Sequence, residues 1–231
     1  MRWLANTNFS MNWATECMVV IPCLNEERAI SGVVRAAREI LPRVLVVDDG
    51  STDGTAKLAA EAGGEVIRHE VPQGKGAALI AGWKRARELG FAWALTMDGD
   101  GQHSAQDIPT FLAAAADGKA DLVVGNRFAG DGRMPWLRRK VNTWMSRRLS
   151  RAAGIALPDS QCGFRLMRLS AWSTLDLRTR HFEIESEVLL GFAARGFKVA
   201  FVPVQSIYKD ELSKIRPWRD TWRWLGWWLR R

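Results

Sequence analysis

Long apolar runs are absent from this sequence of 231 residues, and cysteines are few. No window of about 18 apolar residues occurs, so the sequence predicts no helix that spans a bilayer. Residues 1–16 include Arg2 but no continuous apolar stretch, so we expect no secretory signal peptide. The three cysteines, Cys17, Cys23 and Cys162, are odd in number and lack CxxC spacing, which favours a reducing compartment.

Tyrosine and histidine are also scarce, with one Tyr and three His against twelve Trp. His69, His103 and His181 lie far apart and show no zinc-ligand spacing, so we expect structural or exposed side chains. Charge is biased toward basic residues: 33 Lys+Arg against 25 Asp+Glu give a formal net charge of +8. A basic surface attracts phosphates in nucleotides, lipid head groups or nucleic acids, and Trp favours membrane–water interfaces.

Short apolar runs alternate with segments of helical spacing in the first half of the chain. We expect strands at 17–21, 44–47, 65–68, 91–97 and 120–124, and helices at 26–41, 53–62, 74–89 and 105–116. This order predicts an open α/β fold with a mostly parallel sheet flanked by helices. In such sheets, ligands bind beyond the carboxyl ends of the strands. Asp48, Asp98 and Arg127 each follow a strand end, so we expect them to converge on one edge.

The most informative stretch is Asp98-Gly99-Asp100-Gly101-Gln102, which directly follows an apolar run. Two carboxylates at the tip of a strand suit a hard cation that takes oxygen ligands, and Gln102 can add a neutral oxygen. A cation held by so few protein groups usually shares phosphate oxygens of a substrate. An isolated pair of this kind is more often a glycine-rich turn with solvated acids, so the prediction depends on the rest of the chain.

Gly74-Lys75 is similar to part of a phosphate-binding P-loop. That motif also needs a glycine five positions earlier and Ser or Thr after the lysine. This chain has His69 and Gly76 there. We therefore predict that Lys75 begins a helix rather than binds a phosphate.

Two segments of the second half combine tryptophan with arginine and lysine. In the expected helix 135–153, apolar residues share one face and basic residues another: Leu137, Val141 and Trp144 against Lys140, Arg147 and Arg151. Residues 217–231 repeat the arrangement, with Trp218, Trp222, Leu225 and Leu229 against Arg219, Arg223 and Arg230. Helices of this composition typically lie in the plane of a membrane interface. Two alternatives stay open: an ordinary solvated surface helix for 135–153, and packing on the protein's own core for 217–231.

Several motifs follow one another along the chain, and together they resemble a known family. They are Val19–Glu27, Val46–Gly54, Gly74–Gly76, Met97–His103, Asp159–Arg165, Phe182–Glu187, Val202–Val204 and Ser213–Lys214. The chain resembles the family 2 glycosyltransferases with the GT-A fold, and the later motifs resemble the dolichol- and polyprenol-phosphate mannosyltransferase branch. The resemblance covers residues 18 to about 216, so we expect an N-terminal extension at 1–16 and a glycosyltransferase domain at 17–216, with 135–153 as its acceptor or membrane helix. The Trp and Arg pattern predicts an interfacial helix at 217–231.

The resemblance implies a hexosyltransferase with a nucleotide-sugar donor, GDP- or UDP-linked, and Mg²⁺ or Mn²⁺ as cofactor. By position, the nucleoside would be held by Pro22, Leu24, Glu26, Val46 and Asp48, and the metal by Asp98, Asp100 and Gln102. The donor site would also include Gly99 and the phosphate-binding Arg127 and Lys214; of these groups, Asp100, Arg127 and Lys214 would be catalytic. Arg139 and Ser213 would contact an acceptor phosphate. One departure is Tyr208, with Lys209 beside it, where the family often has Arg.

The branch implies a polyprenyl phosphate acceptor and an enzyme bound peripherally to the anionic cytoplasmic face of a membrane, with no nucleic-acid partner. A phosphate monoester has its second pKa near ~6, so its oxygen attacks without a general base. In-line attack at the anomeric carbon would invert its configuration.

Two other functions stay open. An enzyme that glycosylates a hydroxyl of a lipid or polysaccharide would need a base, and Glu183 or Glu185 stands where hydroxyl-accepting relatives place one. The second is a basic, non-catalytic module that binds anionic membranes or nucleic acid. A nucleotidyltransferase would leave the Gly-Phe-Arg and Ser-Lys segments unexplained.

Overall fold

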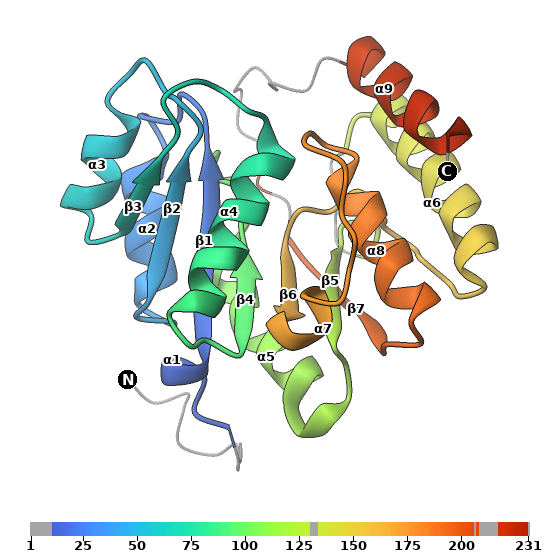
Figure 1. The fold of residues 1–231 in the computed structure, drawn as a ribbon, viewed down its shortest axis with the longest axis horizontal. Helices are drawn as coiled ribbons and strands as arrows, with labels where there is room; N and C mark the ends of the chain where they lie inside the picture. The colour runs from blue at the N-terminus through green and yellow to red at the C-terminus, as the bar shows by residue number, and fades with distance from the viewer. Residues whose placement is uncertain (1–10, 130–133, 206, 208–216, 231) are drawn as a thin grey trace.

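The protein folds around one seven-stranded sheet with helices on both faces (Figure 1). The structure, a computed structural model, describes residues 11–129, 134–205, 207 and 217–230. The strands are β1 (Cys17–Cys23), β2 (Val44–Asp48), β3 (Glu65–Arg68), β4 (Trp93–Thr96), β5 (Leu122–Asn126), β6 (Arg165–Arg168) and β7 (Val199–Pro203). Their order is β3-β2-β1-β4-β6-β5-β7, and every pairing is parallel except those of β6 with β4 and β5. The predicted α/β fold with a mostly parallel sheet is confirmed.

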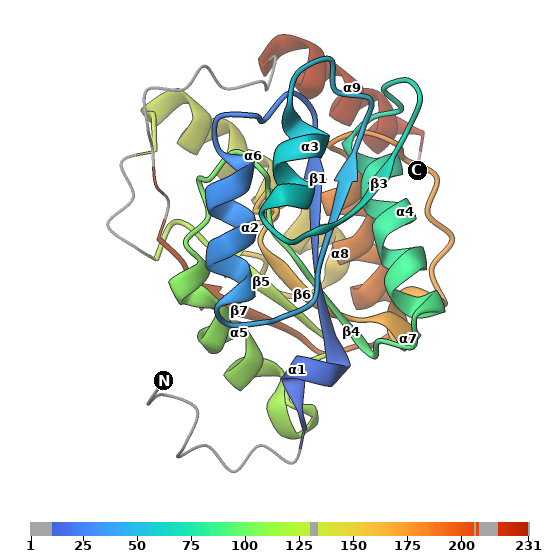
Figure 2. The same ribbon diagram turned by 90° about the vertical axis from the view of Figure 1, so that its left-hand side faces the viewer.

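Helices flank this sheet on two sides. They are α1 (Trp13–Glu16), α2 (Ile30–Arg38), α3 (Thr55–Glu61), α4 (Lys75–Glu88), α5 (Ile108–Ala115), α6 (Trp136–Ala153), α7 (Leu169–Trp172), α8 (Ile184–Ala194) and α9 (Pro217–Leu229). Figure 2 shows α2 and α5 on one face of the sheet and α4, α7 and α8 on the other. In the described parts of the chain, no helix is both long and apolar enough to cross a membrane.

The strands β1, β2 and β4 form the centre of the core. Every residue of the three is buried, as expected of parallel strands covered on both faces. Helix α4 approaches them closely because Gly82 has no side chain: a Cβ there would lie 2.4 Å from Val20 Cγ1. The buried indole Nε1 of Trp83 donates to Thr96 Oγ1 at 3.0 Å. These contacts fix α4 so that its first residue lies at the carboxyl edge of the sheet.

The structure differs from the predictions in several details. Trp13, in the predicted N-terminal extension 1–16, is buried and packs edge-on against Trp93 at a centroid distance of 5.5 Å. Helix α2 begins at Ile30 rather than residue 26, because Asn25 adopts a left-handed φ of 54° and starts a turn. The antiparallel strand β6 was not predicted, since its four residues carry an arginine at each end.

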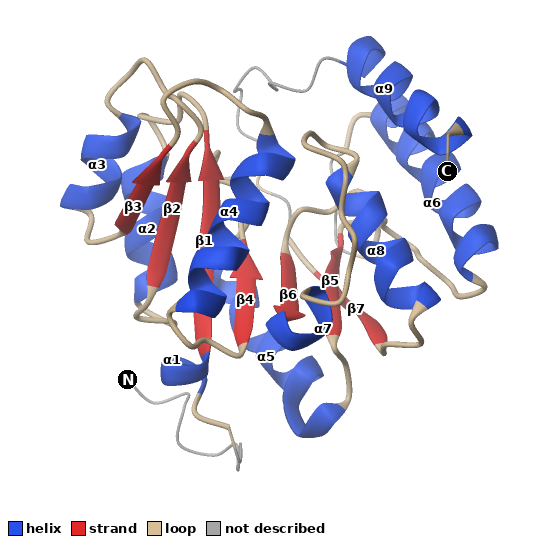
Figure 3. Cartoon of the chain, in the orientation of Figure 1, coloured by secondary structure: helices blue, strands red, loops and turns tan. Residues whose placement is uncertain are grey.

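Helices α6 and α9 lie side by side at the edge of the molecule beyond α8 (Figure 3). Helix α9 packs on the protein through one face. Its Trp224 is 2% exposed, donates from Nε1 to Ser186 Oγ at 2.9 Å, and meets Trp144 edge-on at 5.6 Å. The alternative of packing on the core therefore holds for this face, whereas Trp222 and Leu229 remain exposed. The side chain of Trp218 lies outside the described residues.

Candidate active site

The Asp98–Gln102 turn lies at the carboxyl end of β4, and two of its backbone amides donate hydrogen bonds to nearby side chains. The amide of Asp98 donates to His103 Nδ1 at 3.1 Å, and the amide of Gln102 donates to Asp100 Oδ1 at 2.9 Å. Gly99 packs against the end of β1, where a Cβ would lie 2.4 Å from Cys23 Sγ. The turn thus holds both carboxylates at the sheet edge that the strand pattern predicts.

Lys75 is a member of this site that the sequence did not reveal. Its Nζ lies 2.7 Å from Asp98 Oδ1 and 2.7 Å from Glu185 Oε1. Lys75 is the first residue of α4, as predicted, but its ammonium reaches the strand tip and the first turn of α8. In the sequence Lys75 stands out only as a lysine between two glycines, because its partners Asp98 and Glu185 are distant in sequence.

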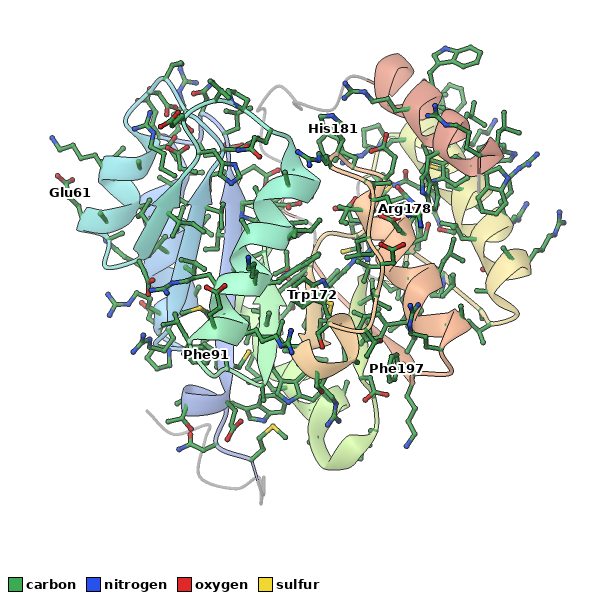
Figure 4. All side chains as sticks on the ribbon, viewed as in Figure 1. Glu61, Phe91, Trp172, Arg178, His181 and Phe197 are labelled. Atoms are coloured by element: carbon green, nitrogen blue, oxygen red, sulfur yellow. The ribbon has the colours of Figure 1, made fainter. Side chains whose placement is uncertain are left out.

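Glycines make room for this cluster. A Cβ on Gly163 would lie 2.9 Å from Asp98 Oδ2 and 3.0 Å from Lys75 Nζ. A Cβ on Gly74 would collide with His181, which lies in the segment that leads into α8 (Figure 4). The glycines of the Gly74–Gly76 and Asp159–Arg165 motifs therefore allow α4, the strand tip and the 159–165 segment to meet.

The charges within the cluster set the protonation of the two aspartates. Burial would raise the pKa of Asp98, but Lys75, His103 and Arg127 outweigh it and lower the pKa to about 2. Burial also works against the charge of Lys75, yet Asp98 and Glu185 raise the pKa of its ammonium. The pKa of Asp100 is raised, by burial and by the nearby charge of Asp98. Asp98 is thus in direct contact with a cation, whereas at Asp100 burial and the charge of Asp98 outweigh the effects of His103 and Lys75 on the pKa.

The donor atoms fit a metal that a substrate helps to hold. In the described ranges, no group of three or more His, Cys, Asp or Glu side chains is arranged to hold a metal. Asp98, Asp100 and Gln102 supply oxygen atoms only, and Mg²⁺ commonly binds one or two carboxylates plus substrate phosphates. A divalent cation beside Asp100 would relieve the repulsion that raises the pKa of this residue.

Two of the predicted nucleoside residues, Leu24 and Glu26, lie on the loop after β1, which is hydrogen-bonded to the loop after β2. The amide of Asn25 donates to Ser51 Oγ and the amide of Thr52 donates to Asn25 Oδ1, both at 2.8 Å. The amide of Glu26 donates to Thr55 Oγ1 at 2.8 Å. These bonds fix the loop after β1 on the loop after β2, and Leu24 and Glu26 are partly exposed there.

The other three predicted nucleoside residues are buried. Pro22 and Val46 lie inside strands, and Asp48 accepts from the amide of Ser51 at 3.0 Å and faces Arg68 Nε at 3.2 Å. As placed, these residues support the loops. Their direct contact with a nucleoside stays a prediction.

Arg127 is held by a buried carboxylate. Its Nε and Nη2 donate to the two oxygens of Asp159 at 2.8 and 2.9 Å. Arg165 anchors the other end of the same segment, with Nη1 donating to the backbone oxygen of Glu185 at 2.6 Å. Arg127 still lowers the pKa of Asp98 and so lies within electrostatic reach of the site. Its contact with a phosphate stays a prediction.

The remaining predicted residues separate into three groups. Glu185 is buried against Lys75, and Glu183 is 7% exposed with its Oε2 lacking a hydrogen-bond partner among the described residues. Arg139 is exposed on α6, its guanidinium 5.8 Å from the ring centroid of Phe128, directly after Arg127. Ser213 and Lys214, with Tyr208 and Lys209, lie outside the described residues.

Known proteins share both the sequence and the fold. The chain is 31% identical to a UDP-N-acetylglucosamine–dolichyl-phosphate N-acetylglucosaminyltransferase of Methanococcus voltae, over 83% of this chain and 86% of that protein. It is 31% identical to a polyprenol monophosphomannose synthase of Mycolicibacterium smegmatis, over 81% and 76% of the two chains. Glucosyl-3-phosphoglycerate synthase of Mycobacterium tuberculosis, solved with Mg²⁺ and UDP, superposes with a TM-score of 0.68 at 21% identity, over 86% and 73%.

The family model for "Glycosyl transferase family 2" matches residues 18–175, which include the Asp98–Gln102 turn, Lys75 and the Asp159–Arg165 segment. With the GT-A-like sheet and the relatives at about 30% identity, this match confirms the family that the motifs resemble. The chain belongs to glycosyltransferase family 2.

Proposed function

We propose that this glycosyltransferase moves a sugar from a GDP- or UDP-linked donor to a polyprenyl phosphate, with inversion, at the cytoplasmic face of a membrane. The contact between Glu185 and Lys75 is the observation that favours a phosphate acceptor over a hydroxyl acceptor. The names of the relatives from Methanococcus voltae and Mycolicibacterium smegmatis support the same acceptor class.

The donor would bind along the carboxyl edge of β1, β2 and β4. Leu24 and Glu26 offer exposed surface for the nucleoside there, and Asp98, Asp100 and Gln102 would hold Mg²⁺ or Mn²⁺ beside the diphosphate. The bound metal would act as a Lewis acid that neutralises charge on the leaving diphosphate. Arg127, and Lys214 outside the described residues, would add fixed positive charge for the same purpose.

The acceptor determines whether a base is needed. A phosphate oxygen is anionic at neutral pH and attacks the anomeric carbon directly. A hydroxyl would have to give its proton to a carboxylate within hydrogen-bond reach. Glu185 Oε1 is already in contact with the ammonium of Lys75 at 2.7 Å, which makes it a poor base. This contact favours the phosphate acceptor, with Arg139 and Ser213 proposed to bind it.

A hydroxyl acceptor is the second candidate, and Glu183 is the observation that favours it. Its carboxylate is buried, and Oε2 has no hydrogen-bond partner within the described part of the chain. A sugar or lipid hydroxyl could donate to this oxygen. Glu183→Gln separates the two functions: transfer to a phosphate should stay within about threefold of wild type, whereas loss of a base costs about 10²–10⁴-fold.

The outer faces of α6 and α9 are the proposed membrane surface. Trp136 and Leu137 of α6 are 68% and 57% exposed, and Trp222 and Leu229 of α9 are 69% and 81% exposed. The buried face of α6 instead carries Asn142, Met145, Ser146 and Leu149. Lys140 and Arg148 lie 4.8 and 4.6 Å from the ring centroids of Trp136 and Trp144. Exposed tryptophan beside basic residues is the composition of an interfacial helix.

A donor panel tests the proposed function. Purified protein is given UDP- and GDP-sugars with Mg²⁺ or Mn²⁺ and a short-chain polyprenyl phosphate. We expect release of the nucleoside diphosphate that depends on metal and is accelerated by the acceptor. A non-catalytic basic module would release none with any donor, and that result would reject the proposal.

A further inference from the structure

Lys75 connects the predicted metal site to the half of the molecule that would bind the acceptor. We propose that Lys75 is a positioning residue that serves as the internal counter-cation of Asp98 and thereby keeps the affinity of the empty donor site for a divalent metal low. The proposal rests on the proposed function in one respect, the assignment of a metal to Asp98 and Asp100.

The ammonium is confined between its two carboxylates. Its side chain is 15% exposed, and the side chains of Asp98 and Glu185 are 26% and 6% exposed. The start of α4 is also fixed, because the amide of Gly74 donates to Asp49 Oδ2 at 2.8 Å. Gly163 approaches the ammonium closely on one side, since a Cβ there would lie 3.0 Å from Lys75 Nζ. Lys75 therefore holds Asp98 Oδ1 in one orientation.

The charge of Lys75 opposes a metal at the same carboxylate. A divalent cation bound to Asp98 would lie close to a positive charge in a partly buried site, where such repulsion is only weakly screened. Glu185 has the opposite effect on metal binding, because its negative charge partly neutralises the ammonium beside Asp98. The two residues should thus change metal affinity in opposite directions.

A bound donor would offset the repulsion between the metal and Lys75. A nucleoside diphosphate brings negative charge that compensates both the metal and Lys75, so metal and nucleotide should strengthen each other's binding. Such coupling is reciprocal by thermodynamic necessity. Asp98 and Asp100 would then hold the metal tightly only while a nucleotide is bound.

The test is calorimetric titration of the full-length protein with Mn²⁺ alone, and then in the presence of UDP or GDP. We expect Lys75→Met to bind Mn²⁺ alone about tenfold more tightly than wild type, and Glu185→Gln about threefold more weakly. The strengthening by nucleotide should shrink in Lys75→Met. Lys75→Arg retains the charge, so its affinity for Mn²⁺ should stay below that of Lys75→Met, which separates the loss of charge from the loss of the lysine side chain.

Opposite signs distinguish this role from a purely structural one, in which both variants would lose metal binding together. If both variants weaken Mn²⁺ binding, or neither changes it, the proposal is wrong. Should Lys75→Met fail to fold, the double variant Lys75→Met/Glu185→Gln removes one charge of each sign and should still bind Mn²⁺ more tightly than wild type. Wild-type protein that binds no Mn²⁺ with either nucleotide would instead reject the metal assignment itself, and the proposed function with it.

Discussion

The two halves of the sheet are stabilised by different means. The strands β1, β2 and β4 are buried by the helices that cover them, and they are apolar except for Asp48 at the end of β2 and Thr96 at the end of β4. On the other side, β6 and the segment before it are held by buried polar groups, namely Arg127 on Asp159 and Arg165 on three backbone oxygens. The strands of the first half are therefore placed by apolar packing, whereas the segment before β6 is placed by buried ion pairs and hydrogen bonds to backbone oxygens. Lys75 joins the two.

The largest expected effect is on catalysis in the first half. Asp100→Asn removes the charge of a predicted metal ligand but leaves the Lys75–Asp98 contact in place. We expect turnover to fall by about 10³-fold or more, because transition-state charge would lose the metal that neutralises it. Steady-state kinetics with the preferred donor measure this. Asp176→Asn changes an exposed acid and is the control; activity of Asp100→Asn near that of the control would remove Asp100 from the site.

A stability effect of comparable importance is expected where α9 packs. Trp224→Ala should lower the free energy of unfolding by about 3–5 kcal/mol, because it empties a buried site and removes one of the two hydrogen bonds that Ser186 Oγ accepts. Trp222→Ala, on the exposed face of the same helix, should leave stability unchanged and weaken binding to anionic vesicles. Urea unfolding and liposome co-sedimentation measure the two effects. Equal loss of stability in both variants would mean that α9 has no separate inner and outer faces.

The stability of the segment before β6 should depend strongly on Arg165. Arg165→Met removes hydrogen bonds to the backbone oxygens of Cys162, Ser160 and Glu185. We expect a loss of about 3 kcal/mol, since buried acceptors would be left unsatisfied. Arg178→Gln, at a largely exposed ion pair, is the control and should unfold at the wild-type urea concentration. An Arg165→Met protein as stable as this control would contradict the comparison.

The smallest change is one methyl group at the junction of the halves. In Gly163→Ala the new Cβ would lie within 3.0 Å of Asp98 Oδ2 and Lys75 Nζ, so we expect activity to fall about tenfold or more with only modest loss of stability. Gly32→Ala is the matched control, because a Cβ at Gly32 in α2 meets nothing within 4 Å. Activity assays and thermal unfolding compare the two. Unchanged activity in Gly163→Ala would show that this approach does not matter to the site.

Sequence patterns predicted the first half better than the second for a physical reason. Apolar runs identify strands such as β1 and β2 because both faces are buried. β6 carries Arg165 and Arg168, so hydropathy gives no signal for it, and its antiparallel pairing depends on contacts distant in sequence. The same limit hid Lys75, whose partners Asp98 and Glu185 are brought to it only by the tertiary fold.

The exposed residues of α6 and α9 illustrate the opposite case. Leu137 and Trp144 were predicted to share a face of a basic helix, and both are exposed. The amphipathic pattern did not reveal that α9 buries Trp224, because a helix with tryptophan on several sides has no single apolar face. Which face packs is decided by the Ser186 hydroxyl and by Trp144 on a neighbouring helix.

The most direct test of the central claim identifies the product. The wild-type enzyme, its preferred labelled nucleotide sugar and Mn²⁺ are incubated with equal amounts of a short-chain polyprenyl phosphate and the corresponding polyprenol, and products are separated before and after mild acid. The account predicts a labelled sugar phosphodiester that mild acid cleaves, and no glycoside of the polyprenol. An acid-stable glycoside as the main product would contradict the phosphate acceptor and favour Glu183 as a general base.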